Sequence, residues 1–345
     1  MIDFSLSPSM LMTPRKLPHS AWLGHIPFAS WLLEVLRPQR IVELGTHNGA
    51  SFLAFCQAVE AQQISARVFA VDTWQGDEHA GFYGDEIYAE LRDYQQRHYA
   101  GISEMMRMRF DQALEYFADG SIDLLHVDGL HTYEAVREDF ETWRSKLSPR
   151  AVVLFHDSCV RERGFGVWQY WSEISTQFPS FEFSHTHGLG VLLVGEEQPQ
   201  ALLQLAEASR ERGFAPINRL FDALGRNIKN VEEIERVNSG LAAAHGEIGR
   251  LNAEQERLRA LLDRSNDATE EHYAVVESQL PALAQGLSLL ERRVVEEVNS
   301  MRQSLEQSRE ASVAHMVASV APRLDEQDRK LGHLMRPWWR RLAGR

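Results

Sequence analysis

The segment Ile41–Gly49 most constrains the fold of this chain, because its pattern predicts a strand, a glycine-containing turn and the start of a helix. A short apolar run leads into Gly45, and Gly49 precedes an apolar helical stretch over residues 50–59. A strand that enters a helix through such a turn is typical of nucleotide-binding α/β folds. A dinucleotide fingerprint has three glycines, whereas this turn has only Gly45 and Gly49. The turn therefore favours a nucleoside ligand without a pyrophosphate.

Short apolar runs alternate with helical patterns along the following part of the chain. Five of them predict parallel strands joined by helices, and two later ones predict an antiparallel pair. The five are residues 41–44, 68–71, 106–110, 122–127 and 151–155, and the pair is 181–184 and 190–194. We therefore expect an α/β fold with a Rossmann-like, seven-stranded, mostly parallel sheet and helices on both faces, followed by a long helical coiled coil.

Composition and periodicity divide the chain into five segments. They are an N-terminal helical lead or lid over residues 1–40, a catalytic domain over 41–197, a helical connector over 198–230, a coiled coil over 231–310 and a basic tail over 311–345. In the fourth segment, apolar residues recur at heptad positions a and d, first from Ile234 and Val237 and again from Leu280. This period favours a coiled coil that forms a homo-oligomer; the alternative is a helix folded back on its own domain.

Charge and cysteine content limit the partners and the compartment. The net charge is −13, and a general nucleic-acid binder needs a basic face, so we expect no nucleic-acid partner. The two cysteines form no disulfide framework, and no apolar run is long enough to cross a membrane, so we expect a cytoplasmic protein. The tail carries Trp338 and Trp339 among basic residues, which predicts peripheral contact with the inner face of the membrane; a solubilising end is the alternative.

Acidic side chains follow the second and third predicted strands. Asp72 lies at a carboxyl end beside the glycine turn, where it can accept hydrogen bonds from both hydroxyls of a ribose. Asp111 either reaches an adenine amino group or is the N-cap of the next helix. The loop after Asp72 carries Trp74 and Tyr83, which predict a lid that stacks on a ring, or a plain surface loop.

Four residues follow the fourth and fifth predicted strands, namely Asp128, His131, His156 and Asp157. Because the carboxyl ends of parallel strands share one edge of a sheet, we expect these side chains to meet in one crevice. Individually each could be a cap or a loop residue, but their shared position favours a functional cluster. His187, before the last strand, either lines the same pocket or belongs to a turn.

Together these motifs resemble the class I S-adenosylmethionine-dependent methyltransferases, and more narrowly the bacterial sugar and natural-product O-methyltransferase-like group. The resemblance covers about residues 20–195 and rests on Val42–Gly49, Asp72, Asp128–His131 and Phe155–Asp157. It implies S-adenosylmethionine as cofactor, bound by Glu43, Gly45, Thr46, Gly49, Asp72, Asp111 and Asp128. Within that set, Glu43, Gly45 and Gly49 border the methionine end, and Asp128 faces the transferred methyl group.

Methyl transfer to a hydroxyl needs an in-line nucleophile and a group that takes its proton. His131 or His156 suits the base role because histidine titrates near neutral pH, and Asp128 completes the predicted catalytic set. In the alternative, Asp128, His156 and Asp157 hold Mg²⁺ or another divalent cation that lowers the pKa of the hydroxyl. We expect O-methylation of a sugar, glycan or related hydroxyl-bearing acceptor; a catalytically weak scaffold that organises glycan-synthesis enzymes is the alternative.

Overall fold

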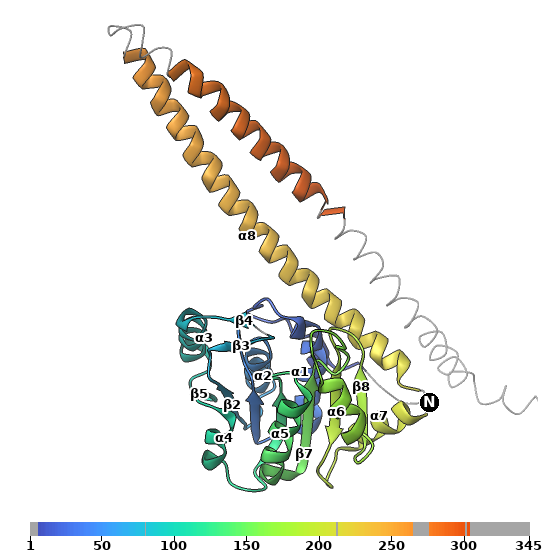
Figure 1. Cartoon of the computed structure of the whole chain (residues 1–345). Helices are drawn as coiled ribbons and strands as arrows, with labels where there is room; N and C mark the ends of the chain where they lie inside the picture. Colours follow the sequence, from blue (N-terminus) through green and yellow to red (C-terminus); the bar gives the residue numbers. More distant parts are fainter. Residues whose placement is uncertain (1–5, 80, 212, 265–275, 301, 304–345) are drawn as a thin grey trace, which may run out of the picture. The chain divides into compact units, whose positions relative to one another are not determined.

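The computed structural model describes residues 6–79, 81–211, 213–264, 276–300 and 302–303 (Figure 1). These residues fall into two compact units, one that includes the described residues up to Lys229 and one that begins at Asn230. The predicted basic tail lies outside the described residues. Within the described part of the chain, no helix has the length and apolar character needed to cross a membrane.

A seven-stranded sheet forms the centre of the first unit, in the order β5-β2-β1-β6-β7-β9-β8. Strand β9 runs antiparallel to both of its neighbours, and the other pairings are parallel. The strands are β1 (Arg40–Leu44), β2 (Arg67–Asp72), β5 (Ser103–Arg107), β6 (Ile122–Val127), β7 (Leu147–His156), β8 (Ser180–Phe183) and β9 (Leu189–Leu193), and β3 (Gly76–Asp77) pairs with β4 (Gly81–Phe82) in a separate hairpin. The predicted Rossmann-like sheet is confirmed.

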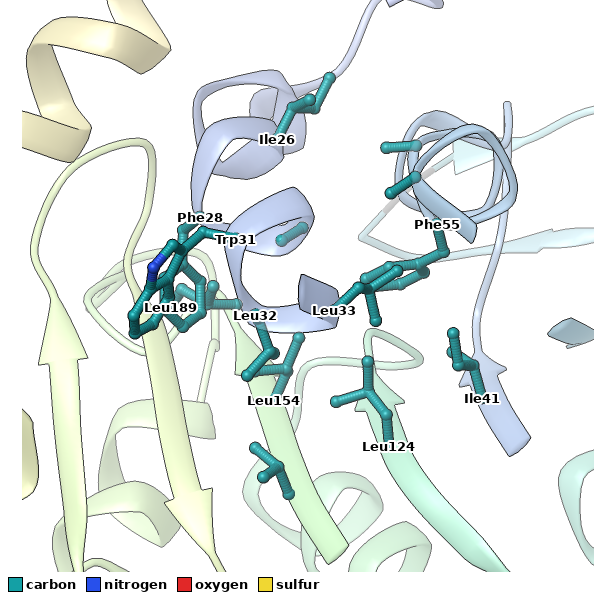
Figure 2. Packing of buried hydrophobic residues seen from close by; sticks show 14 of the residues in the cluster. Ile26, Phe28, Trp31, Leu32, Leu33, Ile41, Phe55, Leu124, Leu154 and Leu189 are labelled. Carbon is teal, nitrogen blue, oxygen red and sulfur yellow. The ribbon is translucent and has the colours of Figure 1, made fainter. Parts of the chain in front are cut away.

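Helices cover both faces of the sheet. Successive side chains of a strand point to opposite sides, so both faces carry apolar side chains that have to be buried. The helices are α1 (Ile26–Leu36), α2 (Ala50–Ala61), α3 (Asp85–His98), α4 (Phe110–Ala113), α5 (Tyr133–Trp143), α6 (Val167–Ile174), α7 (Gln200–Arg210) and α8 (Ala215–Arg264). On one face, Leu124 and Leu154 belong to a buried cluster with Leu33 of α1 and Phe55 of α2 (Figure 2). A second cluster on the opposite face includes residues of α4, α5 and α6.

The third predicted strand was placed three residues too late. The strand is Ser103–Arg107, and Phe110 is already the first residue of α4. The apolar pattern continues past the end of the strand because Met108 and Phe110 pack against the second buried cluster from the loop and the helix. Apolar side chains that cover the end of a sheet therefore lengthened the predicted strand.

In the second unit, one face of each helical stretch is shielded from solvent. Beyond Ile234, the half-buried positions of α8 are Val237, Leu241, Ala244, Ile248, Leu251, Gln255, Leu258 and Leu262. In the helix over residues 276–300, the shielded positions are Val276, Leu280, Leu283, Leu287, Leu290, Val294 and Val298. These residues follow the predicted heptad spacing, but Ile234, the first predicted position, is exposed. The half-buried stripe of α8 therefore begins at Val237.

Candidate active site

The carboxyl ends of β1, β2, β6 and β7 open into one cavity of about 880 Å³. Small-molecule sites in proteins have volumes of roughly 300–1,000 Å³, so this cavity has room for a cofactor and an acceptor. Eight of the predicted site residues line it, namely Gly45, Thr46, Asp72, Asp111, Asp128, His131, His156 and Asp157. Glu43 and Gly49 are not part of its wall.

The glycine turn brings the ends of two neighbouring strands into close contact. Gly45 has a φ of +87°, and a Cβ added to it would lie 2.0 Å from the carbonyl oxygen of Asp128. The Gly45 amide donates to the carbonyl of Val71, and the Asp128 amide donates to that of Leu44. Only glycine satisfies both this backbone conformation and this close approach.

Asp72 holds the turn through its carboxylate. One oxygen accepts hydrogen bonds from the amides of Thr46 and His47 at 2.8 and 3.0 Å, and the other accepts from the amide of Trp74 at 2.7 Å. Asp72 also lines the cavity, and a carboxylate has about four acceptor positions. Asp72 therefore orders the turn and retains capacity for one ligand hydroxyl.

Glu43 lies inside the protein instead of at the cavity. Its carboxylate accepts from Nδ1 of His126 at 2.9 Å, and the indole Nε1 of Trp22 donates to Nε2 of His126 at 3.0 Å. All three side chains are buried. Glu43 and His126 are cross-strand partners on β1 and β6, so their side chains point to the same face of the sheet. Of the three hydrogen-bonded residues, Trp22 lines the cavity.

The cluster predicted after the fourth and fifth strands is assembled in the structure. Nδ1 of His156 lies 3.1 Å from Oδ1 of Asp128 and 3.4 Å from Oδ1 of Asp157. Nε2 of His131 lies 3.0 Å from Oδ2 of Asp157 and 3.4 Å from Oδ1 of Asp128. Two carboxylates and two imidazoles therefore share one corner of the cavity.

The charges in this cluster stabilise one another. Burial lowers the pKa of His156, but the carboxylates of Asp128 and Asp157 outweigh it and raise that pKa to about 9. Burial opposes ionisation of Asp128, yet His156 and the hydrogen bond with His131 hold its pKa well below the ordinary value. His156 therefore acts as a hydrogen-bond donor to the carboxylates.

The described residues bring together one candidate set of cation ligands, Asp128, His131 and Asp157. Their ligand atoms all lie within 4.8 Å of one another. This set differs from the predicted one by having His131 in place of His156. Each imidazole contacts both carboxylates through one ring nitrogen, but His131 is the more accessible of the two, with 13% of its side chain exposed against 5% for His156.

Loop residues complete the site. The ring of Phe165 stacks on His131 and on His79, with centroids 4.6 and 4.5 Å apart. His187 lines the cavity and its Nδ1 donates to Oδ1 of Asp157 at 3.1 Å. Phe165 was missed by sequence analysis because its apolar side chain carries no chemical signature, and the loop path that brings it to His131 is a tertiary feature.

The loop after β2 differs from the predicted stacking lid. Trp74 is fully buried and its Nε1 donates to the carbonyl of His47 at 3.1 Å, so it offers no face to a ligand. Tyr83 does line the cavity, and its ring lies 4.8 Å from that of His47.

Asp111 lies in the first turn of α4, whose N-cap is Arg109. Its carboxylate pairs with the Arg109 guanidinium, at 2.9 Å to Nε and 3.1 Å to Nη2. The alternative role of Asp111 as an N-cap is therefore wrong, and most of its acceptor capacity is directed to Arg109.

Residues 42–158 match a family model described as a methyltransferase domain. Over 189 residues the chain is 57% identical to the uncharacterized protein y4gI of Sinorhizobium fredii, a match that covers 55% of this chain and 21% of that protein. The chain thus spans about a fifth of the length of that relative. Together with the strand order, the family match identifies the segment as a class I S-adenosylmethionine-dependent methyltransferase domain.

Several solved structures are similar in fold. A Staphylococcus aureus protein provisionally described as a caffeoyl-CoA O-methyltransferase is 14% identical with a TM-score of 0.41, covering 52% of this chain and 85% of that one. The SAH-bound Podospora anserina methyltransferase PaMTH1 is 15% identical with a TM-score of 0.38, covering 49% and 77%. Spermidine synthase from Thermotoga maritima is 12% identical with a TM-score of 0.36, covering 52% and 62%.

Proposed function

We propose that this protein transfers a methyl group from S-adenosylmethionine to a hydroxyl of a sugar, glycan or related acceptor. The observation that carries this proposal is that the glycine turn with Asp72 and the cluster of Asp128, His131 and Asp157 open into one cavity. A cofactor seated at the turn and an acceptor beside the cluster would then meet within the same cavity. Proximity of this kind supplies a large part of the rate enhancement in group transfer.

S-adenosylmethionine supplies an electrophilic methyl carbon on a sulfonium sulfur. In the transfer, the acceptor oxygen forms a bond to that carbon, the carbon–sulfur bond breaks, and S-adenosylhomocysteine leaves with the electron pair. The acceptor proton has to move to a base. His131 supports this role because its Nε2 lies within hydrogen-bonding reach of the Asp157 carboxylate, which would stabilise the imidazolium that forms.

The same corner of the cavity suits a divalent cation. Asp128, His131 and Asp157 offer two carboxylates and one imidazole within a short span, and carboxylate oxygens are ligands that Mg²⁺ and Mn²⁺ accept. A bound cation would lower the pKa of the acceptor hydroxyl and orient it. Titration with Mn²⁺ distinguishes this arrangement from a base acting alone.

The lining of the cavity supports a polyhydroxylated acceptor. The rings of Tyr83 and Phe165 come from separate loops, and aromatic faces are suitable surfaces for the apolar faces of a sugar ring. The carboxylates and imidazoles of the cluster offer hydrogen-bond partners to hydroxyl groups. An apolar acceptor would displace water from these polar groups without adding a hydrogen bond to them, which is costly.

Isothermal titration with S-adenosylmethionine and S-adenosylhomocysteine, with and without Mg²⁺, tests the cofactor. We expect both to bind and NAD not to bind. Asp72→Ala should weaken binding by roughly ten-fold or more, because it removes a ligand acceptor and releases two amides of the turn. Asp85→Ala, which removes an exposed carboxylate paired with Arg107, should leave affinity unchanged. A chain that binds neither compound would contradict the proposal.

We further propose that two copies of the chain associate through the heptad stripe of the second unit. The stripe residues are mostly half-buried, with only Leu287 fully buried, so apolar surface remains for another helix to cover. Leu241→Asp with Ile248→Asp should lower the mass measured by light scattering. Ala242→Asp with Gly249→Asp, at exposed positions with the same spacing, should not. An unchanged mass in the first pair would contradict association through this stripe.

A further inference from the structure

Part of the cavity wall comes from α4 and α5 and has no role in the chemistry described above. Phe110 of α4, Gly129 after β6 and Asp139 of α5 line it. A Cβ added to Gly129 would lie 2.6 Å from the Phe110 ring and 3.2 Å from Oδ2 of Asp139. The aromatic ring and the carboxyl group therefore flank the same short stretch of backbone, and even a methyl group at position 129 would crowd the ring.

The carboxyl group of Asp139 has no cationic neighbour in the described part of the chain. Burial, with a smaller contribution from the charge of Glu138, raises its pKa to about 7. A half-buried acid without a protein partner is costly unless another group donates to it. Its position on the wall of the cofactor cavity indicates that this donor belongs to a ligand.

Asp111, the residue expected from sequence to contact adenine, is less suited to that role. It is paired with Arg109 through two hydrogen bonds, and its side chain is 56% exposed. Solvent competes with a ligand at such a position. Asp139 is more enclosed and has its acceptor capacity unused.

The cofactor also has to place its base in this part of the cavity. With the ribose at Asp72, the methyl end at Asp128 and the acceptor beside Tyr83 and Phe165, the lining from α4 and α5 is a part of the wall left for the base. The exocyclic amino group of adenine is a hydrogen-bond donor, and a carboxylate is its natural acceptor. We propose that Asp139 binds this amino group, with Phe110 bordering the base, and so selects adenine. This inference rests on the proposed use of S-adenosylmethionine.

The experiment compares two ligands by isothermal titration, S-adenosylhomocysteine and S-inosylhomocysteine. The titrations are run at pH 8, above the Asp139 pKa of about 7, so that the carboxyl is mostly ionised. The second compound carries a carbonyl oxygen in place of the amino group, and that oxygen would face the Asp139 carboxylate without a proton between them. We expect the wild-type chain to prefer the adenine compound by roughly ten-fold or more. Asp139→Asn should reduce the preference to about three-fold or less, because an amide can donate to the carbonyl oxygen.

Two variants serve as comparisons. Asp111→Asn tests the competing residue, and Glu134→Gln removes a charge from the same helix at an exposed position outside the cavity; both should keep the wild-type preference. Asp139→Ser provides a second substitution if the asparagine variant does not fold. Wild-type chain that binds both ligands equally, or an Asp139→Asn variant that keeps the preference, would overturn the inference and leave the proposed function intact. Wild-type chain that binds neither ligand would remove the proposed function itself.

Discussion

Replacing Asp128 with asparagine is expected to lower the rate of methyl transfer by roughly 10²-fold or more while S-adenosylhomocysteine still binds within about three-fold of wild type. Asp128 contacts both His131 and His156 and belongs to the candidate cation set. Whether a cation or a base activates the acceptor, the negative charge of Asp128 is part of the arrangement. The variant keeps the size of the side chain and removes only that charge.

The rate is measured as labelled methyl incorporated from S-adenosylmethionine into extracted glycans, and Mn²⁺ affinity is measured on the same preparations. Asp123→Asn is a matched control. Asp123 lies on β6, the strand that Asp128 follows, and it accepts hydrogen bonds from Gln39 and Ser148, but it does not line the cavity. The substitution should affect stability and leave activity per folded molecule unchanged. Full activity in Asp128→Asn would show that the cluster is structural.

The fold could be predicted because its strands are short apolar runs with clear boundaries in the sequence. The helical lead predicted over residues 1–40 contains α1 (Ile26–Leu36), and β6 follows the predicted residues 122–127. Side chains at the carboxyl ends of strands could also be placed, since the topology brings all such ends to one edge. For this reason Asp72, Asp128 and Asp157 line the same cavity.

Other parts of the site depend on which way a side chain points and on what surrounds it. Glu43 precedes the glycine turn by two residues, but the pleat of β1 directs it toward His126 in the interior. Asp139 lies inside an amphipathic helix, where an acid ordinarily faces solvent. Only the packing of α5 beside Phe110 and Gly129 brings it to the cavity.

Gly45→Ala is expected to destabilise the first unit by at least about 3 kcal/mol, because two costs combine at this position. A non-glycine residue at a φ of +87° is strained, and the new Cβ would lie 2.0 Å from the Asp128 carbonyl oxygen. The ends of β1 and β6 would have to separate, although the amides of Gly45 and Asp128 both bond across neighbouring strands there. The melting temperature should fall by roughly 6–12 °C.

Gly120→Ala separates the two costs. Gly120 also has a positive φ, +65°, but no atom lies within 4 Å of the Cβ that alanine would add. It should lose only about 1 kcal/mol, from backbone strain alone. Thermal unfolding followed by circular dichroism measures both variants. If they lose the same stability, the close approach of the two strand ends has no energetic consequence; if Gly45→Ala loses more and also binds S-adenosylhomocysteine weakly, that approach shapes the cofactor site.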